Sequence, residues 1–247
     1  MRKISEDPNI SKEELKRVTY FALTFLVLLI IYIVGWTLTH SIWDCLVVMG
    51  LAFFGCVPAF LADAFMPLTG SIKAIPRKPI DNGKTFRGKR LFGENKTWNG
   101  LIGGFVLGLI VSLILAVLIY PYLYEATRIS FEDGENVLEF ISEAEILFFV
   151  DIETNRTRFI LGQVLLCIGA PLGDLVGSFI KRQTNHTEGK QMLFVDQVDF
   201  ILVAVLLAYV VFPLKWYYIL FLVLVTPLIT ILANVIGYYL GAKKVPW

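Results

Sequence analysis

Residues 159–182 read FILGQVLLCIGAPLGDLVGSFIKR, an apolar segment that nevertheless contains one aspartate, Asp174. A hydrocarbon core of about 30 Å needs about 20 apolar residues in a helix, so this stretch is long enough to cross a membrane. A carboxylate inside such a span costs at least about 2.5 to 3.5 kcal/mol and is normally retained for a charge partner, an ion or a water-filled site. The stretch therefore predicts a transmembrane helix that carries a functional group.

Further apolar segments predict an all-α polytopic membrane protein with about six transmembrane helices. Of the 247 residues, 56% are hydrophobic and only 17% are charged, which excludes an ordinary soluble domain. The fifth expected span is short unless the acidic residues at its start belong to the helix. The three cysteines lie in apolar stretches and are expected to be small buried side chains. The expected spans are Val18–Leu38, Ile42–Phe65, Trp98–Tyr120, Phe159–Ile180, Asp196–Phe212 and Trp216–Leu240.

The distribution of lysine and arginine predicts the orientation in the membrane. With both termini in the cytoplasm, 18 of the 22 cationic residues lie inside, and the other four are Arg128, Arg156, Arg158 and Lys215. This asymmetry follows the positive-inside rule and predicts a multi-pass cell-membrane protein whose polar site faces the cytoplasm. The external segment 121–158 is acidic, and we expect a solvated cap with a helix around residues 137–149 rather than a binding surface.

The cytoplasmic loop 67–97 is the strongest candidate for a ligand site outside the spans. Eight cations lie between Lys73 and Lys96, interleaved with glycines. Glycines let backbone N–H groups approach anionic oxygens, and the cations supply charge, so the loop suits a triphosphate. Lys96 and Thr97 also stand at the start of a helix, where backbone amides favour an anion. The alternative interpretation is a polybasic patch bound to anionic lipid headgroups.

Carboxylates within the spans predict a metal site, and glycines predict which helices pack closely around it. Asp174, Ser178 and Lys181 lie on one face of their helix, and Asp196 and Asp199 share a face of the next. Carboxylate oxygens of this kind suit Mg²⁺, which binds through one or two carboxylates plus substrate phosphates. A transporter for a phosphate-bearing lipid stays an alternative, because it would also place carboxylates in spans. Glycines at every fourth position predict close helix packing, at Gly100, Gly104 and Gly108 and at Gly169, Gly173 and Gly177.

Four segments carry a resemblance to a known family: residues 78–84 (KPIDNGK), 87–97 (RGKRLFGENKT), 173–182 (GDLVGSFIKR) and 196–200 (DQVDF). Together they resemble the archaeal CDP-archaeol synthases, membrane cytidylyltransferases related to the phosphatidate cytidylyltransferases. The resemblance implies that CTP and an isoprenyl glycerol phosphate, unsaturated archaetidic acid, react to CDP-archaeol and pyrophosphate with Mg²⁺ as cofactor. It also implies a five-span enzymatic domain at residues 42–247, preceded by a cytoplasmic segment and an additional first helix at residues 1–41.

The same resemblance implies roles for individual residues. The metal ligands would be Asp174, Asp196 and Asp199, which with Lys181 would also be the catalytic residues. The contacts to CTP and its phosphates would be Asp81, Asn82, Lys84, Arg87, Asn95, Lys96, Thr97, Ser178 and Arg182. The expected partners are CTP, the lipid substrate and membrane lipids, and no nucleic acid. A diacyl phosphatidate stays an alternative substrate. The oligomeric state is left open, with a homodimer as one possibility. Whether Asp63 is a metal ligand is also left open.

Overall fold

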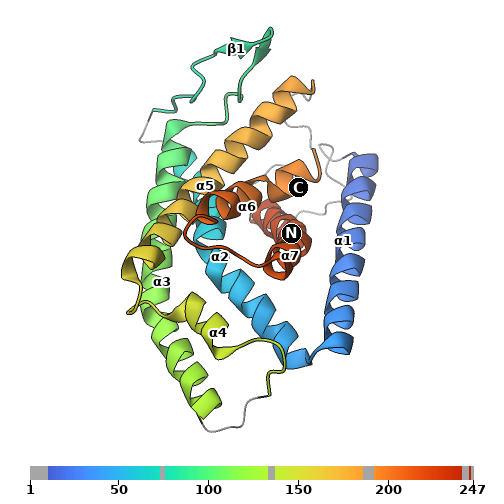
Figure 1. The fold of residues 1–247 in the computed structure, drawn as a ribbon. Coiled ribbons are helices and arrows are strands. Elements are labelled where there is room, and N and C mark those ends of the chain that lie inside the picture. Colours follow the sequence, from blue (N-terminus) through green and yellow to red (C-terminus); the bar gives the residue numbers. More distant parts are fainter. Residues whose placement is uncertain (1–10, 73–75, 133–136, 186–191, 241–244, 246–247) are drawn as a thin grey trace.

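The computed structural model describes residues 11–72, 76–132, 137–185, 192–240 and 245. Five of its helices are long and apolar enough to cross a membrane, which confirms a helical polytopic membrane protein (Figure 1). Two short strands, β1 (Thr85–Phe86) and β2 (Lys89–Arg90), pair as an antiparallel hairpin. The helices are α1 (Lys12–Thr39), α2 (Ile42–Gly70), α3 (Trp98–Glu132), α4 (Glu143–Val150), α5 (Arg156–Gln183), α6 (Val195–Ala208) and α7 (Trp216–Tyr239).

The glycine stripes bring two pairs of helices into close contact, as the sequence predicts. A Cβ atom added at Gly108 of α3 would lie 2.7 Å from the Cα atom of Ala62 on α2. Gly173 of α5 lies equally tightly against the backbone of Asp199 and Phe200 on α6. In lipid, where no hydrophobic force draws helices together, such backbone approach supplies much of the packing energy. The carboxylates of α5 and α6 are thereby held between helices.

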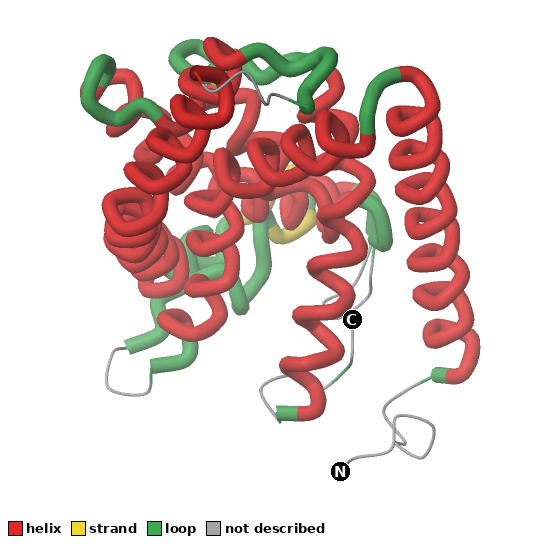
Figure 2. Tube along the Cα trace, turned by 90° about the horizontal axis from the view of Figure 1, so that it is seen from below, coloured by secondary structure: helices red, strands yellow, loops and turns green. Residues whose placement is uncertain are grey.

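α1 packs along α7 at the edge of the bundle, where it is the helix at the right-hand side of Figure 2. The hydroxyl of Tyr32 donates to the carbonyl of Tyr217 at 3.2 Å, and the ring of Trp36 lies 5.2 Å from that of Tyr217. Nearer the start of α1, Phe25 stacks on Phe194 with 6.1 Å between the ring centroids. Many other apolar side chains of α1 are exposed, as expected for a helix that faces lipid.

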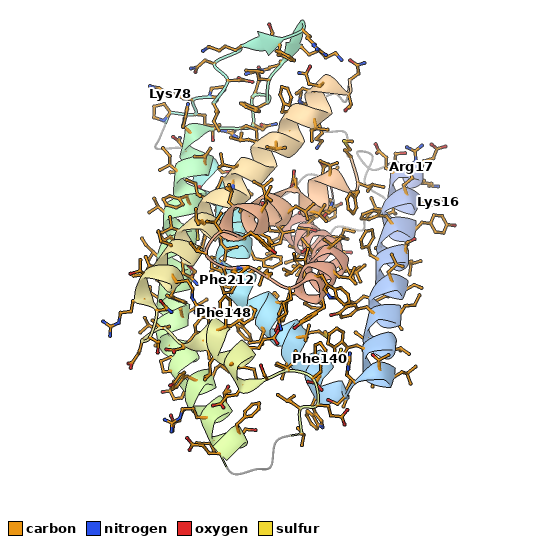
Figure 3. The ribbon with its side chains drawn as sticks, in the orientation of Figure 1. Lys16, Arg17, Lys78, Phe140, Phe148 and Phe212 are labelled. Atoms are coloured by element: carbon orange, nitrogen blue, oxygen red, sulfur yellow. The ribbon has the colours of Figure 1, made fainter. Side chains whose placement is uncertain are left out.

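The acidic segment 121–158 is only in part the solvated cap that its charge predicts. Ile146, Phe149 and Val150 of α4 are buried, and the ring of Phe149 lies 5.1 Å from that of Phe212. Figure 3 shows the neighbouring Phe148 beside Phe212. The apolar face of α4 decides this arrangement, because it covers the end of the bundle away from the hairpin. The expected helix at 137–149 is shorter, and residues 121–132 continue α3 instead of forming a loop.

Two carboxylates attach this segment to the membrane helices. Asp44, in the first turn of α2, accepts hydrogen bonds of 2.8 to 3.1 Å from the backbone N–H groups of residues 139–141. Glu145 of α4 accepts hydrogen bonds from the ammonium of Lys215 at 2.7 Å and the hydroxyl of Tyr218 at 2.8 Å. Buried carboxylates supplied with donors in this way fix their surroundings. The far end of the bundle is therefore tied together.

α6 is shorter than the expected span at 196–212. It begins at Val195, so the acidic residues do start the helix, but it ends at Ala208 after 14 residues. Its length of about 21 Å falls short of a hydrocarbon core of about 30 Å. α6 is not among the five candidate spans in the described residues, and the predicted total of six is not confirmed. Residues 209–215 complete the path to Lys215, which contacts α4.

The loop between α2 and α3 folds back on the start of α3. The N–H of Ile80 donates to the carbonyl of Lys96 at 2.8 Å. Beyond this contact the hairpin turns at Arg87 and Gly88, whose φ values of 53° and 74° fit the type I′ turn that suits a twisted two-stranded ribbon. The hairpin, which the prediction of helices and loops did not include, protrudes at the end of the molecule opposite α4 (Figure 1).

Candidate active site

A cavity of about 370 Å³ lies at the hairpin end between α2, α3, α5, α6 and α7 and the loop. Cavities that hold small molecules in proteins have volumes of about 300 to 1,000 Å³. Its charged lining residues are Asp63, Arg77, Lys96, Asp174 and Asp196. Its neutral polar lining includes Asn95, Thr97, Thr230 and Asn234, and its apolar lining includes Met66, Ile80, Leu101 and Leu175.

Lys96 and Asp174 form an ion pair in this lining. The Nζ atom of Lys96 lies 2.5 and 2.6 Å from the two carboxylate oxygens of Asp174. Burial acts to lower the pKa of Lys96, but the charges of Asp174, Asp199 and Asp63 outweigh it, and the pKa is raised above its usual value. The ammonium therefore stays charged at neutral pH. A cation from the loop and a carboxylate from inside a span meet at this point.

A second ion pair joins α5 to α6. The Nζ atom of Lys181 lies 2.8 Å from Oδ2 of Asp196, and the same oxygen accepts the N–H of Met192 at 2.9 Å. Asp196 lines the cavity, whereas Lys181 stands behind it. Asp174 and Lys181 are seven residues apart on α5, and each pairs with a charge at this end of the bundle, as the helical spacing predicts.

Asp199 lies between α5 and α6 rather than in the cavity lining. A Cβ atom at Gly177 would collide with its carboxylate, so the glycine makes room for this side chain. Oδ1 of Asp199 accepts the N–H of Phe200 at 2.7 Å. Asp199 acts electrostatically on Asp174 and Lys96. The predicted trio of carboxylates is thus at one end of the bundle, although only Asp174 and Asp196 reach the cavity surface.

Asp81 organises the loop from within. Its carboxylate accepts two hydrogen bonds of 3.1 Å from the guanidinium of Arg90. Three backbone N–H groups donate to it as well, from Gly83 at 3.0 Å, Phe92 at 3.2 Å and Gly93 at 3.0 Å. Burial opposes ionisation, but these donors hold the pKa of Asp81 well below its usual range. The side chain shapes the loop and does not line the cavity.

The remaining predicted nucleotide contacts divide into two groups. Asn95, Lys96 and Thr97 line the cavity, and the hydroxyl of Thr97 accepts the N–H of Gly100 at 3.3 Å, which caps α3. This places the first turn of α3 at the cavity. The predicted contacts that lie off the lining are Asn82, Lys84 and Arg87, all exposed, and Ser178 and Arg182 on α5. Contact of any of them with a nucleotide stays a prediction.

α2, α7 and the loop add side chains to which the sequence assigned no role. Asp63 lines the cavity and its charge acts on Lys96. Arg77 comes from the loop, and Thr230 and Asn234 come from successive turns of α7. An asparagine in an otherwise apolar span was a usable signal, because polar groups at membrane depth are costly. The packing of α7 against the cavity has no comparable signature in the sequence.

The donors around Lys96 suit a divalent cation that is shared with a substrate. The charges of three carboxylates, those of Asp63, Asp174 and Asp199, act on the ammonium of Lys96. Their oxygens are the hard ligands that Mg²⁺ takes together with substrate phosphates. Within the described ranges, however, no three histidine, cysteine or acidic side chains converge closely enough to hold a metal ion. Asp174, Asp196 and Asp199 are therefore not a preassembled cage.

A protein-family model matches this chain over most of its length. The family model described as CarS-like, CDP-archaeol synthase, matches residues 44–147 and 134–247, so α1 precedes both matched segments. A solved structure from a study of "an intramembrane enzyme for archaeal membrane lipids biosynthesis" aligns with 74% of this chain and 92% of that chain, with a TM-score of 0.49 and 23% identity.

Relatives align with this chain over nearly their whole length. The CDP-archaeol synthase of Pyrococcus furiosus is 34% identical over 197 residues, which cover 79% of this chain and 96% of the relative. That of Thermococcus kodakarensis is 34% identical over 200 residues, 79% of this chain and 95% of the relative. That of Methanococcoides burtonii is 32% identical over 201 residues, 77% of this chain and 99% of the relative. The chain belongs to the CDP-archaeol synthase family.

Proposed function

We propose that the cavity at the hairpin end is the active site of a membrane cytidylyltransferase, which transfers CMP from CTP to an isoprenyl glycerol phosphate and forms CDP-archaeol. Family membership supports the reaction class. The observation that carries the location is the contact between Lys96 and Asp174, which brings a loop cation to an intramembrane carboxylate 78 residues away. The volume of about 370 Å³ is in the range of small-molecule sites.

Different side chains of the cavity lining suit different parts of the two substrates. The charged side chains suit the triphosphate, and the neutral polar groups of Thr230 and Asn234 suit the nucleoside. Met66, Leu101 and Leu175 add apolar surface between membrane helices. This surface suits the first carbons of the lipid chains, whose remainder stays in the hydrocarbon core. Both reacting phosphates can then meet near Lys96.

The reaction is an in-line displacement at phosphorus. A non-bridging oxygen of the lipid phosphate attacks the α-phosphorus of CTP and forms a new P–O bond. The bond from the α-phosphorus to the oxygen that bridges to the β-phosphate breaks, and its electron pair leaves with pyrophosphate. Such transfers need little covalent help from the protein, so positioning and charge neutralisation dominate catalysis.

The described side chains provide those two contributions. Lys96 would neutralise charge on the nucleotide phosphates. Arg77, the second cation in the cavity lining, would do the same at another point. Asp174 and Asp196, the two predicted ligands that line the cavity, would hold Mg²⁺, which when bound supplies further charge neutralisation and orients the phosphates. Lys181 would keep Asp196 in place, because its ammonium contacts that carboxylate at 2.8 Å.

A cytoplasmic site fits the charge distribution of the molecule. Lys16, Arg17 and Lys78 lie at the hairpin end, whereas Phe140 and Phe148 lie toward the α4 end (Figure 3). By the positive-inside rule, this distribution supports a cavity on the side where CTP is available. The alternative function of a lipid-phosphate transporter has no support from the family, whose relatives are synthases.

A competition assay tests the proposed function and the choice of lipid. Purified protein receives labelled CTP, Mg²⁺ and equal amounts of a geranylgeranyl ether phosphate and a diacyl phosphate. We expect CDP-lipid and pyrophosphate in equal amounts. The ether should be converted faster, because the chain belongs to the CDP-archaeol synthase family. An apolar groove discriminates chain shapes by about 1 to 3 kcal/mol per methylene-scale mismatch. Faster conversion of the diacyl lipid would assign a phosphatidate cytidylyltransferase. The absence of any CDP-lipid would refute the proposal.

A further inference from the structure

The structure places two groups that the substrates need in contact with each other. The ammonium of Lys96 lies 2.5 and 2.6 Å from the two oxygens of Asp174, so both oxygens of that carboxylate are engaged. The two side chains are 29% and 25% exposed, which makes the pair accessible from the cavity but still largely shielded from water. The proposed reaction needs Lys96 on a phosphate and Asp174 on a divalent cation.

Neither the nucleotide nor the divalent cation can bind alone without leaving one side chain of the ion pair without a partner. A divalent cation on Asp174 would displace the ammonium of Lys96 and stand beside it as a like charge. A triphosphate on Lys96 would leave Asp174 facing additional negative charge. Breaking a shielded ion pair is strongly unfavourable when one partner is left uncompensated. When nucleotide and cation arrive together, each side chain exchanges one partner for another and no charge is left unpaired.

We propose that the Lys96–Asp174 pair makes binding of the nucleotide and of the divalent cation mutually dependent, through this exchange of partners. The inference rests on the proposed function and adds that the pair opposes a nucleotide that arrives without a cation. By linkage, the factor by which the cation tightens nucleotide binding equals the factor by which the nucleotide tightens cation binding. When the products leave, Lys96 and Asp174 pair with each other again.

Two neighbouring carboxylates provide matched controls. Asp63 lines the same cavity and acts on Lys96 through its charge. Asp196 also lines the cavity, and its partner is Lys181 at 2.8 Å. Neutralising either residue removes one negative charge from the cavity, as neutralising Asp174 does. Only the change at Asp174 breaks the pair that Lys96 makes.

The test measures equilibrium binding instead of turnover. Purified protein in detergent, without lipid substrate, is titrated in a calorimeter with α,β-methylene CTP, which cannot transfer CMP, in either EDTA or Mg²⁺. We expect Mg²⁺ to tighten binding to the wild-type protein at least about tenfold. In EDTA, Asp174→Asn should bind the analogue at least about tenfold more tightly than wild type, because Lys96 is released, and should gain less than about twofold from Mg²⁺.

The controls separate partner exchange from a general effect of charge. Asp63→Asn and Asp196→Asn should change the affinity in EDTA by less than about threefold. A gain in Asp63→Asn as large as that in Asp174→Asn would overturn the exchange, since loss of any carboxylate would then suffice. Because these comparisons are made in EDTA, association of the metal with the nucleotide in solution does not contribute.

The remaining outcomes distinguish this inference from the proposed function. Asp174→Ser repeats the measurement with a second neutral side chain, and thermal melts matching wild type establish that the variants fold. If wild type binds the analogue with Mg²⁺ while both Asp174 variants gain nothing in EDTA, the exchange is wrong and the proposed function stands. If wild type does not bind the analogue under either condition, both fail.

Discussion

Lys96 differs from the other cations of its loop in how its side chain is held. Its carbonyl accepts the N–H of Ile80, and α3 begins two residues later, so the backbone on both sides is fixed. Its ammonium then reaches Asp174. Lys84, by contrast, is exposed and off the cavity lining. Cations of one loop thus occupy different environments, and only some of them can neutralise a bound phosphate.

This contrast gives a first prediction from a matched pair of substitutions. Lys96→Ala should lower kcat/KM for CTP at least about a hundredfold, the scale expected when a charge-stabilising group is lost. Lys84→Ala, at a predicted nucleotide contact that is exposed and off the cavity lining, should have a much smaller effect and stay within about threefold of wild type. Initial rates at varied CTP concentration measure both. Equal losses in the two variants would instead favour a diffuse role of the whole basic loop.

A second prediction concerns the dependence of the loop on pH. The pKa of Asp81 is lower in the folded loop than the value of about 3.9 in an unfolded chain. The carboxylate therefore stabilises the loop above about pH 4, and this contribution is lost as pH falls toward the lower folded pKa. Hydrogen exchange at Gly83 and Gly93, corrected for intrinsic rates, should stay slow from pH 7 to about pH 4.

The control for that measurement is Asp81→Asn, which keeps the shape of the side chain but removes its charge. Exchange at Gly83 and Gly93 should be faster in this variant at every pH, because two charge-assisted hydrogen bonds from Arg90 are weakened. Loss of protection in wild type already between pH 6 and pH 5 would contradict the assigned role of Asp81.

Sequence alone indicated the charged part of the site because such residues are conspicuous at membrane depth. Asp174 was singled out for that reason, Asp196 as one of an acidic pair on a helix face, and Lys96 as a loop cation at the start of a helix. All three line the cavity. Their mutual pairing was not predicted, since which lysine meets which aspartate depends on how α3 crosses α5. Asn234 was missed because one amide in an apolar helix does not reveal which neighbour it faces.

At the scale of elements, small residues decide which helices approach closely. Gly173 meets the backbone at Asp199, and Gly177 meets the carboxylate of Asp199 itself. The same stripe that packs α5 on α6 therefore also positions a charged side chain. A methyl group at Gly173 must move α6, because helix backbone cannot yield, whereas one at Gly177 must move the side chain of Asp199.

A third prediction follows for Gly173. Gly173→Val should lower the free energy of unfolding by about 1 to 3 kcal/mol, as overpacking commonly does, and should also lower turnover because α6 shifts with Asp199. Thermal melting in detergent and the cytidylyl-transfer assay measure the two effects. Gly50→Val on α2 is the matched control, since nothing lies within 4 Å of a Cβ atom there. Equal melting of both variants would show that the tight contact is unimportant.

Helix existence was predictable from apolar length, whereas helix ends were not. The expected end of the third span at Tyr120 reflects the change to polar sequence, but α3 continues to Glu132 because a helix does not need an apolar environment. α6 ends early because the chain must turn before Lys215 reaches Glu145. The hairpin escaped prediction because its two-residue strands are too short for an alternating pattern.

At the scale of the whole molecule, charge and packing give the two ends different characters. The hairpin end carries the cavity and the loop cations, and the other end is covered by α4. All three cysteines are buried, so engineered cysteines can be labelled against a low background. This makes the orientation of the molecule directly measurable.

The fourth prediction therefore concerns topology. Lys84→Cys should react with a membrane-impermeant maleimide only in inverted vesicles, and Glu125→Cys, on the exposed outer part of α3, only in right-side-out vesicles. The protein with native cysteines alone should remain unlabelled in both preparations. Labelling of the two variants from the same side would contradict the assigned orientation.

The covering of one end by α4 has a consequence for how a membrane grows. Phe149 packs against Gly55 and Phe212, and Glu145 ties α4 to α7, so we infer that the proposed active cavity opens only at the hairpin end, toward one face of the bilayer. Each new liponucleotide is then released into the monolayer from which its precursor came. With the proposed reaction, CDP-lipid accumulates in that monolayer alone, and its supply to the opposite monolayer requires a separate protein that moves lipids across.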